Sequence, residues 1–284
     1  MTILVTAASG HLGRLIVESL LARGVAASDV VAGSRSLDKV ADLAERGVRT
    51  AVVDYDAPET LDAAFAGIDR VVLVSGSEVG KRLAQHQAVI DAAAAAKVGG
   101  LVYTSLYHAT TSPLPLAAEH VATEEALAAS GLPHAILRNN WYIENYAQDV
   151  ARAAESGVIA AAVADGKVAA ATRADFAEAA AVVATDDAYL GRVLELAGDV
   201  AFGYADLAAA ASAIQGRDVT YVALSEEHLL ETLRGAGLDE GTAGFVAALD
   251  AGIAAGALDS EDHTLSQLIG RPTTPLVEGL RAAL

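Results

Sequence analysis

The chain has 284 residues, of which 53% are hydrophobic, so it can bury one large core or a core with a smaller lobe. With 37 acidic and 19 basic residues the formal net charge is −18, a surface that repels nucleic acid and anionic membranes. Cysteine is absent, which excludes disulfides and thiolate chemistry, and no apolar run approaches the roughly 18–20 residues of a membrane span.

The first element is a short apolar strand at Ile3–Thr6, which follows Met1 and Thr2 directly. We therefore expect a cytoplasmic protein with no leader segment. A turn of small residues and a helix come next, in the pattern of a dinucleotide-binding βα turn. The alternative is an ordinary tight turn without a ligand. The residues predicted to bind the cofactor here are Thr6, Ala7, Ala8, Ser9, Gly10, His11, Leu12 and Gly13.

Ala7 stands where such a turn usually has glycine. Because alanine is strained at positive φ, we expect either a negative φ at Ala7 or a slightly altered loop.

Strand-like and helix-like segments then alternate as far as residue 138. The further expected strands are Val30–Ala32, Thr50–Asp54, Arg70–Ser75, Gly100–Ser105 and His134–Arg138. The expected helices are Leu12–Ala22, Ser36–Arg46, Glu59–Ala66, Val79–Lys97 and Ala117–Ser130. The strands are continuous apolar runs and the connections are short, which predicts an α/β fold with a doubly wound parallel (Rossmann) sheet.

After about residue 140 the regular alternation of strand-like and helix-like segments ends, and from Ser225 the chain is expected to be mainly helical. The α/β segments expected in this half are Val158–Val163, Arg173–Ala184, Val193–Leu196 and Tyr204–Ile214. We expect residues 1–150 to bind the nucleotide. Residues 151–284 should form a smaller α/β lobe that caps the sheet and returns one strand to it.

The end of the second strand indicates which nucleotide is bound. No acidic residue follows it, and Ser34 and Arg35 stand there instead. Arg35 can bind a 2′-phosphate with charge-assisted hydrogen bonds, worth a roughly ten- to hundredfold preference for NADPH over NADH. The alternative is that Arg35 is merely exposed beside an N-cap at Ser36.

Two other strand ends support a cofactor. Asp54 is placed to accept a hydrogen bond from the adenine amine, or else it forms a turn. The small residues Ser75, Gly76 and Ser77, with Glu78, suit a strand that passes beneath the cofactor.

Nine segments carry a family resemblance: Val5–Gly13, Ser75–Gly80, Tyr103–Ala109, Glu119–Glu124, Leu137–Tyr146, Asp165–Lys167, Ala171–Asp175, Glu195–Asp199 and Thr264–Thr274. Together they resemble the NmrA-like atypical short-chain dehydrogenases and, more narrowly, the type 2 NAD(P)H:quinone oxidoreductases. The resemblance implies direct hydride transfer from NADPH to a quinone without flavin. It also implies further cofactor contacts at Ser105, Asn139, Asn140, Trp141, Tyr142 and Arg173.

The catalytic pair of ordinary short-chain dehydrogenases is missing. None of the eight tyrosines has a lysine four residues later, and the matching register holds Leu116, His120 and Glu124. This argues against alcohol oxidation by the usual route. A quinone needs less help, because hydride addition gives a stabilised phenolate.

Tyr107 and His108, just beyond the fifth strand, are placed to donate to the developing oxyanion. His108 is otherwise a polar loop residue, and His120 either binds the cofactor ribose or supports helix packing. Asn140 suits the nicotinamide amide, and Tyr142 or Tyr146 either stacks on a quinone or belongs to the core. No spacing typical of a metal site occurs.

Two other functions remain open: a non-catalytic NADP-binding sensor that acts through partners, and a reductase of another activated carbonyl or nitro compound. The small-molecule partner expected first is a quinone, and a homodimer is compatible with every reading.

Overall fold

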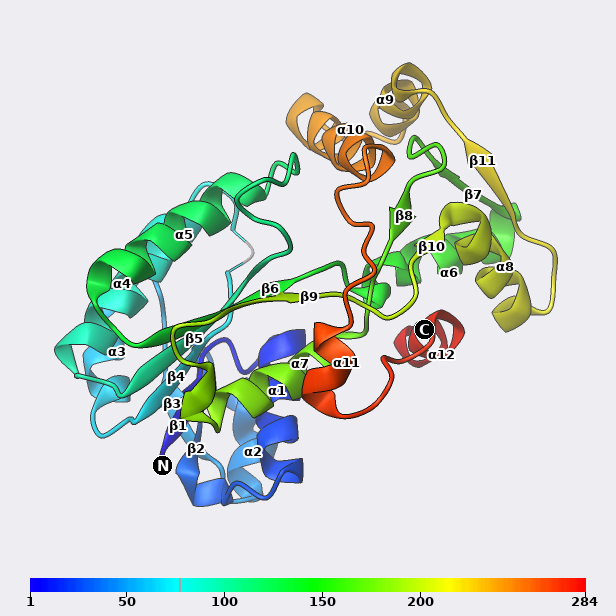
Figure 1. The fold of residues 1–284 in the computed structure, drawn as a ribbon. Coiled ribbons are helices and arrows are strands. Elements are labelled where there is room, and N and C mark those ends of the chain that lie inside the picture. Colours follow the sequence, from blue (N-terminus) through cyan, green and yellow to red (C-terminus); the bar gives the residue numbers. More distant parts are fainter. Residues whose placement is uncertain (77) are drawn as a thin grey trace. The chain divides into compact units, whose positions relative to one another are not determined.

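The computed structural model describes residues 1–76 and 78–284. A seven-stranded sheet has the order β3-β2-β1-β4-β5-β6-β9 (Figure 1). Its strands are β1 (Ile3–Val5), β2 (Val30–Ser34), β3 (Arg49–Val52), β4 (Arg70–Leu73), β5 (Gly100–Leu106), β6 (His134–Asn139) and β9 (Val193–Leu196). The pairs from β3 through β6 are parallel, which confirms the doubly wound arrangement.

By its internal contacts the chain divides into two compact units. The first unit contains Met1–Ala109, Ala118–Asn139 and Arg173–Glu195, and the second contains Thr110–Ala117, Asn140–Thr172 and Leu196–Leu284. The segment Arg173–Glu195 therefore belongs to the first unit, although it follows residue 150 in sequence. It supplies a helix and most of β9.

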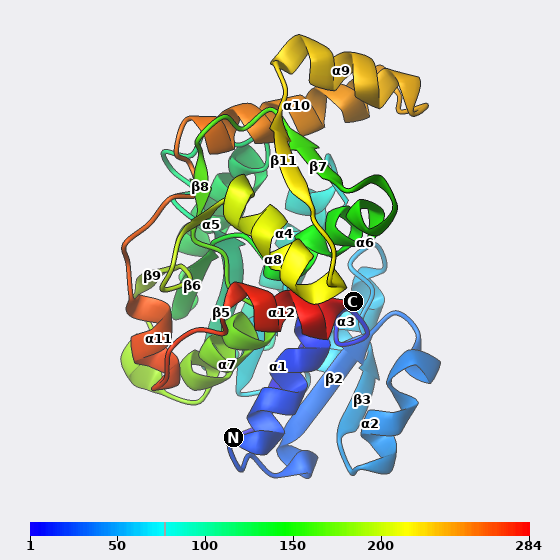
Figure 2. The ribbon, with the colours of Figure 1, turned by 90° about the vertical axis from the view of Figure 1, so that its right-hand side faces the viewer.

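Helices cover both faces of the sheet in the first unit (Figures 1 and 2). The helices of this unit are α1 (His11–Ala22), α2 (Ala41–Glu45), α3 (Pro58–Phe65), α4 (Arg82–Ala95), α5 (Ala117–Ser130) and α7 (Arg173–Ala184). α1 packs on α7 and α3 packs on α4. The helix expected over Ser36–Arg46 is instead a short 3-10 turn, Leu37–Val40, followed by α2.

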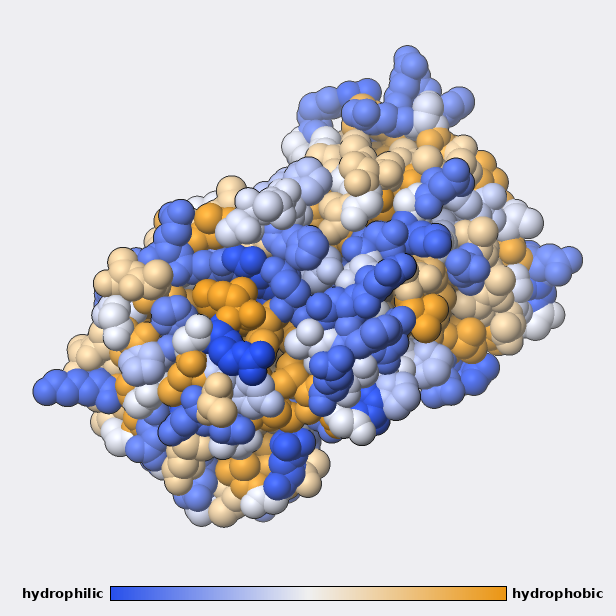
Figure 3. All heavy atoms as spheres, in the orientation of Figure 1, coloured by the Kyte–Doolittle hydropathy of each residue, from blue (hydrophilic) through white to orange (hydrophobic). Residues whose placement is uncertain are grey.

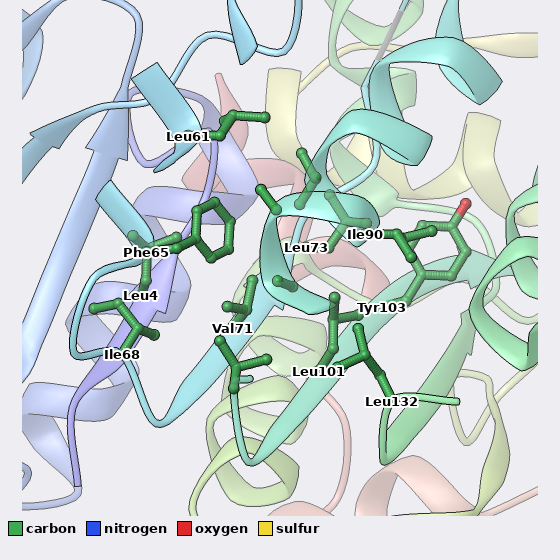
Figure 4. Close-up of a cluster of buried hydrophobic side chains, with 14 of the residues drawn as sticks. Leu4, Leu61, Phe65, Ile68, Val71, Leu73, Ile90, Leu101, Tyr103 and Leu132 are labelled. Carbon is green, nitrogen blue, oxygen red and sulfur yellow. The ribbon is translucent and has the colours of Figure 1, made fainter. Parts of the chain in front are cut away.

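The α3, α4 and α5 side of the sheet holds a continuous apolar core (Figure 4). Leu4, Val71 and Leu101 come from neighbouring strands and are fully buried. Phe65 of α3 and Ile90 of α4 pack against them from above the sheet. Burial of each such side chain contributes about 1.5–3 kcal/mol, so this layer holds the strand ends in fixed register.

The second unit contains two small sheets and six helices. β7 (Val158–Ala161) and β11 (Thr220–Ala223) are parallel, and β8 (Lys167–Val168) pairs antiparallel with β10 (Phe202–Gly203). The helices are α6 (Ala147–Ser156), α8 (Tyr204–Gln215), α9 (Glu226–Gly235), α10 (Glu240–Ala254), α11 (Thr264–Ile269) and α12 (Leu276–Ala283). β7 and β11 run side by side next to α8 in both ribbon views.

Hydrophilic side chains interrupt the apolar ones across the face shown in Figure 3. The exposed large hydrophobic residues of the described chain come from separate elements, among them Val52, Val79, Val200 and Val222. In the part of the chain that the structure describes, no helix is both long and apolar enough to cross a membrane.

Candidate functional site

The turn between β1 and α1 is built by backbone hydrogen bonds. The N–H of Ala8 donates to the carbonyl oxygen of Gly33 at 2.8 Å, and the N–H of Gly10 donates to that of Ala7 at 2.9 Å. A Cβ atom on Gly13 would lie 2.4 Å from the Ala7 oxygen, so only glycine lets α1 approach β1 this closely. Gly10 caps α1 without a side-chain bond, which leaves the helix N-terminus suited to a pyrophosphate.

Ala7 itself has a φ of +49°, so the expectation of a negative φ there is wrong. The two backbone hydrogen bonds on either side of Ala7 hold the turn in the conformation that glycine would take. Alanine is strained in this left-handed region by about 1–2 kcal/mol. The turn keeps its shape at that cost.

Arg35 and Glu78, both predicted to bind the cofactor, lie close together. A guanidinium nitrogen of Arg35 is 3.6 Å from Oε1 of Glu78, and Lys81 Nζ is 3.1 Å from Oε2. The Arg35 side chain is 70% exposed, so it is open to an approaching phosphate. The hydrogen bond from Lys81 lowers the pKa of Glu78, which therefore carries its negative charge beside Arg35. Ser77 lies outside the described residues.

Asp54 accepts a hydrogen bond from the N–H of Asp56 at 3.1 Å, which fits its alternative as a turn former. Its neighbour Tyr55 was not predicted as part of the site. The Tyr55 hydroxyl lies 2.5 Å from Oγ1 of Thr6, and the same Thr6 oxygen accepts the N–H of Val74 at 3.0 Å. These bonds fix the end of β1 against the end of β4.

The loop after β4 is held by side chains of α4. The N–H of Gly76 donates to Nε2 of His86 at 3.0 Å, and Nε of Arg82 donates to the Gly76 oxygen at 2.8 Å. Arg82 also pairs with Glu119 at 2.7 Å. Ser75 is bound as well, its N–H donating to Oγ1 of Thr104 at 2.9 Å. Ser75 and Gly76, the first two residues of the segment predicted to lie beneath the cofactor, are therefore fixed by hydrogen bonds.

His86 must be neutral to accept this bond, with its proton on Nδ1, 3.0 Å from Oγ1 of Thr123. Burial, and secondarily the charge of Arg82, lower the pKa of His86 to about 3. Sequence reasoning missed Arg82 and His86. The available signal was three polar residues, Arg82, Gln85 and His86, on one face of a helix that must pack on a sheet.

The end of β5 gathers several predicted residues. The rings of Tyr107 and His108 are stacked, with centroids 4.0 Å apart and planes inclined by 14°. His108 is exposed and Tyr107 is 3% exposed. Oγ of Ser105 donates to Glu124 at 2.5 Å, so its hydroxyl hydrogen is already used.

His120 belongs to α5 and is buried between that helix and the sheet. Its Nδ1 lies 2.8 Å from the Tyr103 hydroxyl, which fits a role in packing α5 on β5. Burial, with smaller effects of Arg82 and His86, lowers the pKa of His120 to about 3.

The remaining predicted residues divide between the units. Asn139 ends β6 in the first unit, where its side-chain amide is buried with no hydrogen-bond partner among residues 1–76 and 78–284, and Arg173 begins α7 there. Asn140, Trp141 and Tyr142 belong to the second unit. Within that unit the Asn140 amide donates to the Leu258 oxygen at 3.2 Å and accepts the Trp141 N–H at 2.7 Å.

Tyr146, also in the second unit, packs edge-to-face on Phe202 and Tyr204 and is 3% exposed. This supports its alternative as a core residue. Among the residues that the structure describes, no cluster of three or more His, Asp or Glu could hold a metal ion.

A doubly wound parallel sheet whose first strand leads through a small-residue turn into a helix N-terminus defines a dinucleotide-binding protein of the Rossmann class. The chain belongs to the NmrA-like family, whose sequence profile matches residues 1–249. The family resemblance expected from the motifs is thus confirmed.

Known proteins resemble the chain over its whole length. Quinone oxidoreductase 2 of Escherichia coli is 45% identical over 278 residues, covering 98% of this chain and 97% of that protein. A crystal structure of an NADPH-dependent quinone oxidoreductase from Escherichia coli, in complex with NADPH, matches with a TM-score of 0.94 over 99% of each chain. The Citrobacter sp. triphenylmethane reductase complexed with NADP(H) matches with a TM-score of 0.93 at 33% identity, over 100% of each chain.

Proposed function

We propose that this chain is an NADPH:quinone oxidoreductase that transfers hydride directly, without a flavin. The observation that carries the proposal is the full-length similarity to a quinone oxidoreductase, 45% identical over 98% of the chain. The similarity extends through both units, so it includes more than the nucleotide-binding turn.

The residues of the first unit fit NADPH. The close approach at Gly13 and the uncapped N-terminus of α1 suit the pyrophosphate, whose negative charge the backbone N–H groups bind. The exposed guanidinium of Arg35 suits the 2′-phosphate. Gly76 is held by His86 and Arg82 just after β4, where the chain is expected to pass beneath the cofactor.

When bound, NADPH supplies the hydride, and the protein has to orient the quinone and stabilise one developing negative charge. Delivery of hydride to one carbonyl oxygen of a quinone leaves the other oxygen as a phenolate, which takes one proton to give the hydroquinone. Tyr107 and His108, at the C-terminal end of β5, are the donors we assign to that oxygen. The Tyr-x-x-x-Lys pair is not required, because the aromatic product already disperses the charge.

The test is NADPH oxidation by purified protein with a benzoquinone or naphthoquinone as acceptor and no added flavin. Turnover above a protein-free control supports the proposal. NADPH binding without turnover of any quinone would favour the sensor function instead. Faster turnover of a triphenylmethane dye would favour the dye-reductase activity named for the Citrobacter relative.

A further inference from the structure

A network of charged side chains connects four elements of the first unit. Arg138 of β6 binds both oxygens of Glu124 on α5, through Nε at 3.0 Å and Nη2 at 2.6 Å. Its Nη1 donates to Oε1 of Glu195 on β9 at 2.9 Å. The side chains of Glu124, Arg138 and Glu195 are 9%, 13% and 26% exposed, so the three charges are shielded from water and fixed in direction.

The second oxygen of Glu195 reaches the turn after β5. Oε2 accepts the backbone N–H of His108 at 2.9 Å. His108 has a φ of +50°, in the left-handed region that residues other than glycine rarely occupy. Such a conformation persists where the surrounding structure holds it. Here the Glu195 carboxylate fixes the plane of the Tyr107–His108 peptide, relative to which the φ of His108 is defined.

The network also reaches the strand just before this turn. Oγ of Ser105 donates to Oε1 of Glu124 at 2.5 Å. The chain before and after Tyr107 is therefore connected to the Arg138 guanidinium. Ser105 is connected through Glu124, and His108 is connected through Glu195. The Tyr107 N–H in turn donates to the Asn139 oxygen at 2.9 Å, which keeps Tyr107 on the sheet.

We propose that Glu195 is a positioning residue for the quinone reaction, because with Arg138 it holds His108 in the left-handed conformation that stacks the Tyr107 and His108 rings. The inference rests on the proposed function, in which these two rings donate to the oxygen of the quinone. Glu195 therefore influences the reaction by holding the turn after β5 that carries Tyr107 and His108.

A carboxylate is required at this position because each of its oxygens faces a donor. Oε1 faces Arg138 and Oε2 faces the His108 N–H. A glutamine has one acceptor oxygen and one donor nitrogen, so in either orientation one of the two contacts becomes donor against donor. Glu195→Gln therefore disrupts one of these two contacts without a change in side-chain size.

The first experiment compares E195Q with E18Q. Glu18 also pairs with an arginine of the first unit, Arg46 at 2.6 Å, but on the exposed surface, so it is a matched control. For E195Q we expect kcat/KM for the quinone to fall about tenfold, because misplaced donors lose transition-state contact. The NADPH Kd, measured by fluorescence, should stay within about twofold of wild type. E18Q should change neither. If E195Q weakens NADPH binding as much as it lowers kcat/KM for the quinone, or if it leaves kcat/KM unchanged, the proposal is overturned.

The second experiment repeats E195Q in a His108→Gly background. Glycine takes a positive φ without strain, so the turn no longer needs the hydrogen bond from Glu195 to keep its conformation. The effect of E195Q on the residual quinone activity should then shrink to within about twofold. A tenfold loss in both backgrounds would mean that Glu195 acts by another route.

A crystal structure of E195Q separates this inference from the proposed function. If wild-type protein turns over no quinone, the proposed function fails. The E195Q structure still tests whether Glu195 holds the conformation of the turn at His108. We expect His108 to move to a negative φ and the two rings to separate. A φ and ring stacking unchanged from +50° and 4.0 Å would overturn the positioning role.

Discussion

Three described residues of the first unit other than glycine have a positive φ, Ala7, Lys97 and His108. The two of them that lie in turns of the predicted site are held in different ways. Ala7, after β1, has a φ of +49° and is held by backbone hydrogen bonds of its own turn and of β2. His108, after β5, has a φ of +50° and is bonded by the side chain of Glu195, which is 87 residues away in sequence. The first turn is built from main-chain groups that suit a phosphate. The second depends on side-chain charges and carries the rings assigned to the quinone.

The difference predicts that the two turns can be damaged separately. Substitutions in the charge network should impair quinone reduction and leave NADPH binding intact. Loss of a predicted nucleotide contact, as in Arg35→Ala, should weaken NADPH binding and leave the arrangement of the Tyr107 and His108 rings intact.

The largest effect is expected from Arg138→Leu. It leaves Glu124 and Glu195 as shielded carboxylates without their cation, which should lower the free energy of unfolding by about 3 kcal/mol. The hydrogen bond to Glu124 and, secondarily, that to Glu195 raise the pKa of Arg138, so its cation persists at every working pH. Urea denaturation measures the change.

Arg46→Leu is the control for this variant, since the Arg46–Glu18 pair is exposed and should contribute far less to stability than the shielded network of Arg138. Equal losses of stability in the two variants would show that the network of Arg138 is no stronger than a surface ion pair.

The next effect is expected from Arg35→Ala. Loss of a charge-assisted bond to a 2′-phosphate should raise the NADPH KM about ten- to hundredfold and leave the NADH KM nearly unchanged. Steady-state kinetics with both nucleotides at a fixed quinone concentration measure the ratio. If both KM values rise equally, Arg35 does not recognise the 2′-phosphate.

Acid should destabilise the fold through two buried histidines. Burial lowers the pKa values of His86 and His120 from 6.5 to about 3, so the folded state binds fewer protons than the unfolded state between these pH values. Their stabilisation is complete above pH 6.5 and is lost as the pH falls toward 3, by about 1.4 kcal/mol per pH unit for each histidine.

Thermal unfolding across this pH range measures the slope. His86→Gln should make it shallower, whereas His228→Gln, at an exposed position, should leave it unchanged. A wild-type Tm that stays constant from pH 6.5 down to 4.5 would contradict the lowered pKa values.

The smallest effect is expected from Ala7→Gly. Relief of the strained φ should raise the free energy of unfolding by about 0.5–1 kcal/mol, with NADPH affinity retained because the backbone bonds remain. Chemical denaturation and a fluorescence titration measure the two quantities. A loss of stability would show that the turn does not strain Ala7.

The close turn between β1 and α1 could be predicted because its signal is local. Consecutive small residues between an apolar strand and a helix specify a close approach, and Gly13 meets that requirement directly. The sign of φ at Ala7 could not be predicted, because it depends on a hydrogen bond to Gly33, in a different strand.

The residues that hold the site in place could not be predicted for a similar reason, since their contacts depend on the tertiary fold. Arg138 and Glu195 are 57 residues apart, and only the placement of β9 next to β6 brings them together. His86 and Arg82 look like ordinary helix residues until α4 packs over the end of β4. Their role follows from tertiary contacts with Gly76, which no short sequence pattern encodes.

The most direct test of the central claim measures NADPH consumption and hydroquinone formation together, with protein freed of any flavin. Direct hydride transfer predicts equal molar amounts of NADPH oxidised and hydroquinone formed, at a rate proportional to protein concentration. Turnover that appears only after a flavin is added, or NADPH binding with no hydroquinone formed, would contradict it.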